Sequence, residues 1–294
     1  MVRAATWTQT YEKTSKHKRA IMLSRAEPGA GAAFVPPPGR NFTISNVELD
    51  IYVHFVLRLP QPMLAGVDKC VCGCSIDSMG DHLFSCSELR YARKPMHDGL
   101  CRLWMEFNRK YGDRHVRNDD LDKQQHWKAY SPNHCPDVTL LDYRHGHIIC
   151  DVTTTHPNCD TYLQPKEVNS STWPLVAARA AEKTKDREYG EAVRNGPHKL
   201  LPLVFETYGA CGPQLNKFFA QVQAEKAKNI GIHASNDGDR DNDEIRQERK
   251  LFFKNAPFTA RSHVSYWRQR FAVSLACGVS SFIAMQAQRL ALKK

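Results

Sequence analysis

The sequence predicts an α/β (α+β) fold in which a small mixed sheet is flanked by helices. Two strand-like runs, residues 136–143 and 147–153, are separated by three residues, which is short enough for a β-hairpin. A third apolar run, residues 199–209, ends in a glycine turn and is followed by a helix-like segment. Segments with helical periodicity lie on both sides of these runs, so helices are available to cover the sheet.

The bulk composition indicates a globular, basic chain. Its 294 residues are 41% hydrophobic, which is enough to build a core. Lys and Arg number 41 against 31 Asp and Glu, and the formal net charge of +10 favours a polyanionic partner such as nucleic acid or an acidic membrane face. Ten cysteines are too few for a disulfide scaffold, and no secretory signal precedes them, so we expect reduced thiols in an intracellular compartment.

The N-terminal part predicts a flexible basic arm over residues 1–45. Residues 1–40 carry seven Lys or Arg and two Glu, and the Pro/Gly/Ala-rich stretch 27–40 offers little surface to bury. A helix is expected from about residue 46 to Pro60, since Val47, Ile51, Phe55 and Leu59 recur every four residues. Together with the cysteines that follow it, this helix forms the predicted unit 46–90.

Further helices are expected on either side of the strand-like runs. Residues 97–110 place Leu100, Leu103, Trp104 and Phe107 on one face, and residues 173–193 are rich in alanine. Residues 213–228 form another helix behind the third strand. Residues 231–250 are expected to form a charged linker, and residues 251–294 a helical region. Within that region the uncharged stretch 271–287 is short for crossing a bilayer, so we predict a buried helix there.

A cluster of cysteines and one histidine predicts a small zinc-binding subdomain. The candidate ligands are Cys70, Cys72, His82 and Cys86, with Cys74 as a competitor for either of the first two positions. His82 and Cys86 are four residues apart, so one helical turn started by Gly80 or Asp81 would aim both at the same point. The alternative is that these are ordinary thiols beside an unrelated histidine.

Two aspartates flank the predicted hairpin at the same end. Asp137 opens the first strand and Asp151 closes its antiparallel partner, so both carboxylates would lie within reach of one cation, with the carbonyl of Val152 as a further oxygen ligand. Metal-dependent phosphodiester cleavage needs such carboxylates to hold Mg²⁺ and a cation beside them. The alternative is that both aspartates cap turns.

The cation that such a site needs beside its carboxylates has to come from another segment, because the residue two positions after Asp151 is Thr153. The alanine-rich helix offers Lys183 and Lys185. Lys185 shares the apolar face of that helix, and a lysine on an inward face needs a partner such as the aspartate pair. Lys183 points elsewhere and could be an ordinary surface charge.

Five motifs in this order resemble the C-terminal part of non-LTR retrotransposon polyproteins of the restriction-like-endonuclease type. They are "CVCGCSIDSMGDHLFSC", "CPDVTLL", "CDVTTTHP", "AARAAEKTKDREY" and "LPLVFETYGACGP", and the similar region spans roughly residues 46–225. In that family a Cys-Cys-His-Cys zinc motif precedes a PD-(D/E)xK nuclease domain, which would occupy residues 91–230 here.

The resemblance implies a Mg²⁺-dependent DNA endonuclease that nicks target DNA, with a structural Zn²⁺ motif that aids nucleic-acid binding. It assigns Asp137 and Asp151 as the magnesium-binding acids and Lys185 as the lysine moved onto the following helix. It further implies a nuclear location and DNA, or RNA, as the partner, with no membrane.

The chain departs from the family pattern in three respects. No Tyr-x-Asp-Asp polymerase signature occurs, Thr153 stands in the usual lysine position, and the acid of the first nuclease helix could be Glu106, His97 or Asp98. Glu206, at the end of the third strand, could reach the same ion or be structural. The alternative function is therefore a catalytically inactive, zinc-dependent nucleic-acid-binding protein, and a third possibility is a protein-assembly module.

Overall fold

A computed structural model of the chain describes residues 8–35, 42–111, 115–118, 135–141, 146–164, 167–194, 196, 198–235 and 262–292. The longer helices are α2 (Lys16–Ala26), α3 (Asn46–Leu57), α5 (Lys94–Tyr111), α8 (Val176–Arg194), α9 (Pro213–Ser235) and α11 (His263–Ala291). The short ones are α4 (Asp81–Ser85), α7 (Asp160–Leu163) and the 3₁₀ turns η1 (Ala32–Phe34), η3 (Pro62–Leu64) and η4 (Ser87–Arg93). The strands are β1 (His115–Asn118), β2 (Val138–Leu141), β3 (Ile148–Thr155) and β4 (Lys199–Glu206).

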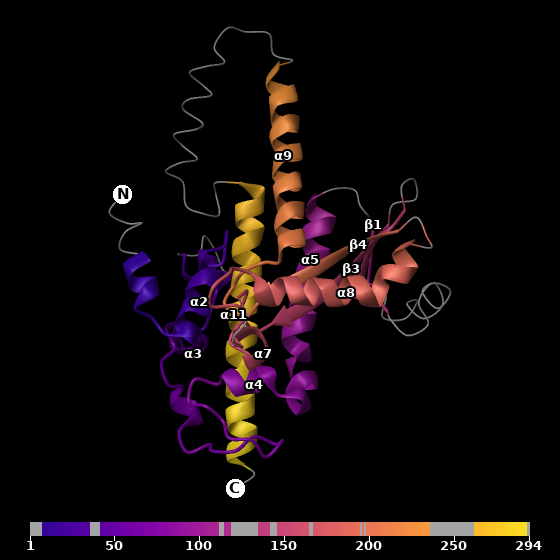
Figure 1. The fold of residues 1–294 in the computed structure, drawn as a ribbon. Helices are drawn as coiled ribbons and strands as arrows, with labels where there is room; N and C mark the ends of the chain where they lie inside the picture. Colours follow the sequence, from indigo (N-terminus) through magenta and orange to yellow (C-terminus); the bar gives the residue numbers. More distant parts are fainter. Residues whose placement is uncertain are drawn as a thin grey trace.

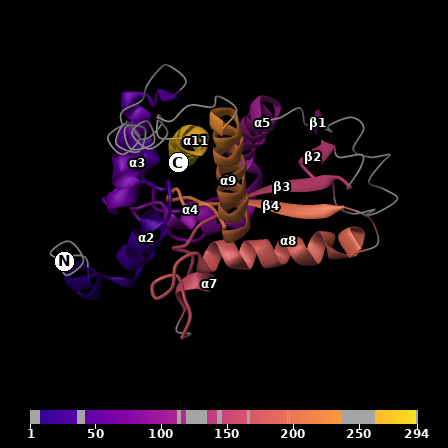
Figure 2. The same cartoon turned by 90° about the horizontal axis from the view of Figure 1, so that it is seen from above.

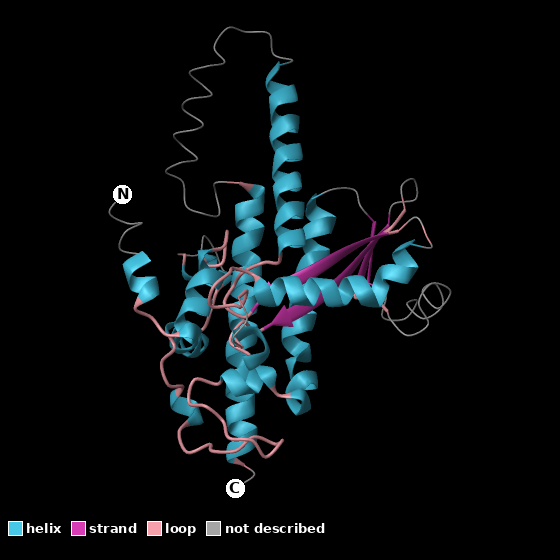
Figure 3. Cartoon of the chain, viewed as in Figure 1, coloured by secondary structure: helices cyan, strands magenta, loops and turns pink. Residues whose placement is uncertain are grey.

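The four strands form one mixed sheet in the order β1-β2-β3-β4. Figure 3 draws the strands in magenta among the cyan helices. β2 pairs antiparallel with β1 and β3, and β3 pairs in parallel with β4. The parallel pair is joined through α8, because parallel neighbours need a crossover connection. The predicted hairpin and the mixed α+β class are thus confirmed.

Helices cover both faces of the sheet. α8 runs alongside β4 and contacts β3 and β4, while α5 contacts β1, β2 and β3 (Figure 2). Side chains alternate along β3, so the strand offers Cys150 and Val152 to the main core and Asp151 to the α8 side. This alternation decides which helix each candidate site residue meets.

The main core lies where α5 and α3 pack against α11 (Figure 1). Leu100, Trp104 and Phe107 of α5 are fully buried, as the predicted helix face required. The ring of Trp104 contacts Phe271 of α11, and that of Phe107 contacts Trp267 of the same helix. Among the described residues, α11 is long and apolar enough to cross a membrane, but most of that stretch is buried inside the protein, as expected for a core helix.

The prediction of a flexible N-terminal arm is wrong for residues 8–35. Residues Lys16–Ala26 form α2, with Ser15 as N-cap, and Ala20, Ile21 and Ala30 are buried. The small residues of the Pro/Gly/Ala stretch allow close backbone packing instead of exposure. A Cβ on Gly209, for instance, would lie 2.3 Å from the carbonyl oxygen of Ala30.

The predicted helix at residues 46–60 is present, but its buried face differs from the expected one. Ser45 and Glu48 form a capping box at the start of α3. Ile51 and Phe55 are buried together with Tyr52 and Val56, whereas Val47 and Leu59 are 66% and 41% exposed. Helix positions four apart differ by about 40° in direction, so Val47 is turned about 80° away from Phe55. Leu59 lies beyond the end of α3, after Arg58 in the left-handed conformation at the C-cap.

The prediction of a linker at residues 231–250 is wrong for its first five residues. Residues 231–235 continue α9, and residues 236–250 lie outside the described part of the chain. The C-terminal helical region is present as α11, and residues 251–261 likewise lie outside the described part.

Candidate functional site

Four of the cysteine and histidine candidates converge on one point. The Sγ atoms of Cys70 and Cys86 are 3.6 Å apart, and Cys72 Sγ lies 3.3 Å from His82 Nε2. All four ligand atoms lie within 4.8 Å of one another, so the cluster could hold a metal ion. The corners of a tetrahedron with zinc–sulfur bonds of about 2.3 Å are about 3.8 Å apart, and the cluster fits that size. Cys74 is exposed and does not belong to this group.

Local backbone structure brings these ligands together. The amide of Gly73, at φ +83°, donates to the carbonyl of Cys70, which closes a tight turn. His82 lies on α4, whose N-cap is Gly80, and Cys86 follows the end of that helix. Sequence reasoning missed Asp77, whose carboxylate accepts from the backbone amides of Asp81 and His82 and thereby fixes the start of α4.

A buried polar network joins this subdomain to the ends of β3 and β4. Asp81 Oδ1 accepts from His156 Nε2 at 3.1 Å, and its other oxygen pairs with Arg58. His156 Nδ1 lies 2.8 Å from Thr207 Oγ1. Burial raises the pKa of Asp81, but the hydrogen bond from His156 and the charge of Arg58 outweigh it and hold the pKa well below the ordinary value. No local sequence pattern predicts this network, because its members come from four separate segments.

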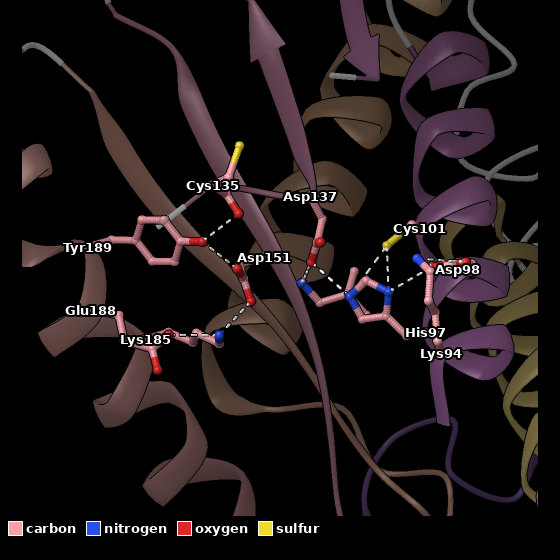
Figure 4. Close-up of polar contacts among 11 residues, drawn as sticks. Lys94, His97, Asp98, Cys101, Cys135, Asp137, Asp151, Lys185, Glu188 and Tyr189 are labelled. Carbon is pink, nitrogen blue, oxygen red and sulfur yellow. Dashed lines mark hydrogen bonds and ion pairs between the residues drawn. The ribbon is translucent and has the colours of Figure 1, made fainter. Parts of the chain in front are cut away.

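Asp137 and Asp151 are neighbours across the β2–β3 pairing, but their carboxylates turn to different sides, that of Asp137 toward α5 and that of Asp151 toward α8 (Figure 4). The register pairs Val138 with Cys150, so Asp137, one residue before β2, comes beside Asp151 in β3. Asp137 Oδ2 accepts from the backbone amide of Val152 at 2.8 Å, and the amide of Asp137 donates to the carbonyl of Cys150. Asp137 therefore sits at the rim of the sheet, as its place at the start of a strand predicted.

Asp151 is held by two side chains of α8. Lys185 Nζ lies 2.9 Å from Asp151 Oδ1, and the Tyr189 hydroxyl lies 2.6 Å from Asp151 Oδ2 (Figure 4). Lys185 also pairs with Glu188 at 2.8 Å. Burial, followed by the charge of Asp137, raises the pKa of Asp151 despite the nearby ammonium group. The sequence analysis did not predict the contact of Tyr189 with Asp151.

The two candidate lysines differ in burial and in the side of α8 on which they lie. Lys185 is partly buried and faces the sheet, where Asp151 and Glu188 keep its pKa above the ordinary value although burial lowers it. Lys183 is exposed on the far side of α8. The structure thus brings Lys185, and not Lys183, to Asp151.

Asp137 meets α5 through a histidine. His97 Nε2 lies 3.0 Å from Asp137 Oδ2, and His97 Nδ1 lies 3.1 Å from Asp98 Oδ1. The hydrogen bond to Asp137, followed by that to Cys101, raises the pKa of His97 to about 11. Of the three residues considered on the first helix, His97 is the one that touches the acidic pair. Glu106 instead pairs with Arg270 and Lys110.

A polar pocket of about 420 Å³ opens beside Lys185. It extends from Phe84 of α4 and Arg93 of η4 to Thr184 and Lys185 of α8, and the threonines of the C-terminal half of β3 line it. Thr153, in the position where a lysine was expected, is one of these. Arg93 and Lys185 bring positive charge to the pocket, several hydroxyls line it, and Glu188, which pairs with Lys185, offsets part of that charge.

Glu206 lies apart from the acidic pair. Its carboxylate accepts from the amide of Ala178 at the start of α8, and the residue is 1% exposed. Burial raises its pKa to about 7. These contacts favour the structural alternative for Glu206.

Comparison with protein-family models, curated proteins and solved structures found no match to this chain.

Proposed function

We propose that the chain is a metal-dependent DNA endonuclease of retrotransposon origin, in which a zinc-bound subdomain aids nucleic-acid binding. The observation that carries the proposal is the contact of Lys185 with Asp151, beside Asp137 at the rim of the sheet. A buried acid, a neighbouring acid and an inward ammonium group are the elements that phosphodiester hydrolysis requires. The sequence resemblance supports the same assignment and a nuclear location.

The donor types suit the proposed ions. Cys70, Cys72, His82 and Cys86 offer the sulfur and nitrogen ligands that structural zinc prefers. The carboxylates of Asp137 and Asp151 and the carbonyl of Val152 are the hard oxygen ligands of Mg²⁺. Bound there, Mg²⁺ would supply an activated water and polarise the phosphate.

The protein's own residues have distinct roles in this proposal. Lys185 stabilises negative charge that develops on the phosphate, and Asp151 holds the ammonium group in place. Tyr189 orients Asp151, and the Val152 amide orients Asp137. The pocket beside Lys185, with Arg93 and the β3 threonines, would receive the phosphates of the bound strand.

A nicking assay tests the proposal. The purified protein, with zinc retained, should convert supercoiled plasmid to the open circle with Mg²⁺ and not with EDTA. Asp151→Asn and Asp137→Asn should each lower the rate by at least about 100-fold. Full activity in the Asp151→Asn variant would refute the assigned site.

A second function is favoured by the way Asp151 is already engaged. Both of its carboxylate oxygens have partners, Lys185 and Tyr189, and among the described residues the groupings of potential metal ligands include Asp137 but not Asp151. A non-catalytic, zinc-dependent nucleic-acid-binding protein would fit that arrangement. It should bind DNA or RNA with strong salt dependence and cleave neither.

A further inference from the structure

A second group of potential metal ligands lies between α5 and the start of β2. Ligand atoms of His97, Cys101 and Asp137 all lie within 4.8 Å of one another. Cys101 Sγ is 3.7 Å from His97 Nδ1 and 3.9 Å from His97 Nε2, and His97 Nε2 is 3.0 Å from Asp137 Oδ2. These separations are similar to those between ligand atoms around one small cation.

We propose that His97, Cys101 and Asp137 form a second metal site, which binds a borderline transition-metal ion such as Zn²⁺ or Co²⁺ in preference to Mg²⁺. One imidazole, one thiolate and one carboxylate are the donors that such ions accept, whereas Mg²⁺ requires oxygen ligands. Three protein ligands leave a fourth position open to water or to a phosphate oxygen.

The surrounding structure holds these ligands in place. His97 and Cys101 are one helical turn apart on α5, so they share a face. That helix is anchored on either side of Cys101 by Leu100 and Trp104, which are fully buried. The Asp137 carboxylate is oriented by the amide of Val152.

The contact between His97 and Asp98 is the second feature that points to a metal. Histidine ligands almost always give their other ring nitrogen to a carboxylate or carbonyl, which fixes the ring and its tautomer. His97 has Asp98 on Nδ1 and the proposed site on Nε2. Lys94 in turn holds Asp98 at 3.2 Å. The competing, metal-free state is a protonated His97 whose two ring N–H groups donate to Asp98 and Asp137.

The site is open on one side. The side chains of His97 and Asp137 are 31% and 20% exposed, and Cys101 is partly buried. An ion could therefore enter without unfolding of the helix. Metal binding here does not depend on the proposed nuclease, because it can be measured without nucleic acid.

A Co²⁺ titration of the full chain tests the proposal. The protein is first given one equivalent of Zn²⁺ to fill the cluster of Cys70, Cys72, His82 and Cys86. Wild type should then bind one equivalent of Co²⁺ with a thiolate-to-cobalt absorption band, and excess Mg²⁺ should not abolish it. Absence of that second equivalent in wild type overturns the proposal.

Variants identify the ligands. Cys101→Ser should remove the charge-transfer band, while Cys277→Ser, on α11, should keep it. Asp98→Asn, which leaves all three ligands intact, should weaken Co²⁺ binding by about 10-fold to 100-fold and keep the band. A band that persists in Cys101→Ser, or an affinity unchanged in Asp98→Asn, contradicts the assignment. Asp137 is shared with the proposed magnesium site, but the contact of Lys185 with Asp151 carries the nuclease proposal, so a failure here does not refute the nuclease.

Discussion

Lys185 Nζ lies 2.9 Å from Asp151 Oδ1, whereas Lys183, two residues earlier on the same helix, is exposed to solvent. If Lys185 stabilises the phosphate, Lys185→Met should lower the plasmid-nicking rate by about 100-fold or more. Lys183→Met removes the same charge from the same helix and should change the rate by less than about twofold. Equal losses in both variants would show that α8 contributes only a general positive potential.

The cluster of Cys70, Cys72, His82 and Cys86 can be tested by substitution of single cysteines. Cys72→Ser should lower the zinc content of the purified protein by about one equivalent, because serine does not replace the thiolate that completes the closed four-ligand site. Cys74→Ser, two residues away on an exposed part of the same turn, should retain that equivalent. Elemental analysis after dialysis measures both. Zinc loss in Cys74→Ser together with retention in Cys72→Ser would exchange the two assignments.

The sequence predicted features that depend on neighbours close along the chain. The helices of residues 97–110 and 173–193, the hairpin of β2 and β3 and the inward position of Lys185 follow from periodicity and turn length. The convergence of His82 and Cys86 follows from one helical turn. Each of these needs no knowledge of how distant segments pack.

The contacts that sequence reasoning missed join segments far apart. His97 meets Asp137 across 40 residues, and His156 meets Asp81 across 75, and neither pair has a spacing signal. The docked N-terminal segment was missed for another reason. Low hydrophobicity suggested exposure, but Ala30, Ala32 and Ala33 are buried there, and Ala30 approaches the backbone of Gly209 closely.

Gly209→Ala tests that close approach. Gly209 has φ +107°, and an added Cβ would lie 2.3 Å from Ala30 O, so the substitution should lower the free energy of unfolding by about 3 kcal/mol. Gly73→Ala is the control, since Gly73 also has positive φ but an added Cβ would meet nothing within 4 Å. Its cost should be about 1 kcal/mol. Urea unfolding at equal zinc loading measures both changes in unfolding free energy. Equal losses in the two variants would show that Ala30 does not lie in close contact with the turn at Gly209.

Tyr189→Phe tests the support of Asp151. The Tyr189 hydroxyl is buried between Asp151 Oδ2 and the carbonyl oxygen of Cys135, and its one proton can serve either. Its removal leaves a buried carboxylate oxygen without a donor and should cost about 2 kcal/mol of unfolding free energy. Tyr91→Phe, at a side chain that is 75% exposed, should change stability by less than about 0.5 kcal/mol. A cost near zero for Tyr189→Phe would mean that water replaces the hydroxyl.

The pH dependence of stability should report the burial of Glu206. Its pKa is raised from 4.5 to about 7, so the folded state holds a proton that the unfolded state releases above pH 4.5. The stability that this protonation contributes is complete below pH 4.5 and is lost as the pH rises through 7. Glu206→Gln keeps an acceptor for the Ala178 amide. The free energy of unfolding of this variant, relative to that of wild type, should therefore rise by on the order of 3 kcal/mol between pH 5 and pH 8.

Urea unfolding of both proteins at the two pH values measures this gain, and the difference between them cancels the other titrating groups. The matched control is Glu106→Gln. Its hydrogen bond with Arg270 lowers the pKa of Glu106 to about 2, so this carboxyl is ionised in both folded and unfolded states over most of that range. The Glu106→Gln difference from wild type should stay nearly constant from pH 5 to pH 8. A constant difference for Glu206→Gln as well would place its carboxyl in contact with water, and the start of α8 would then be more open than the Ala178 contact indicates.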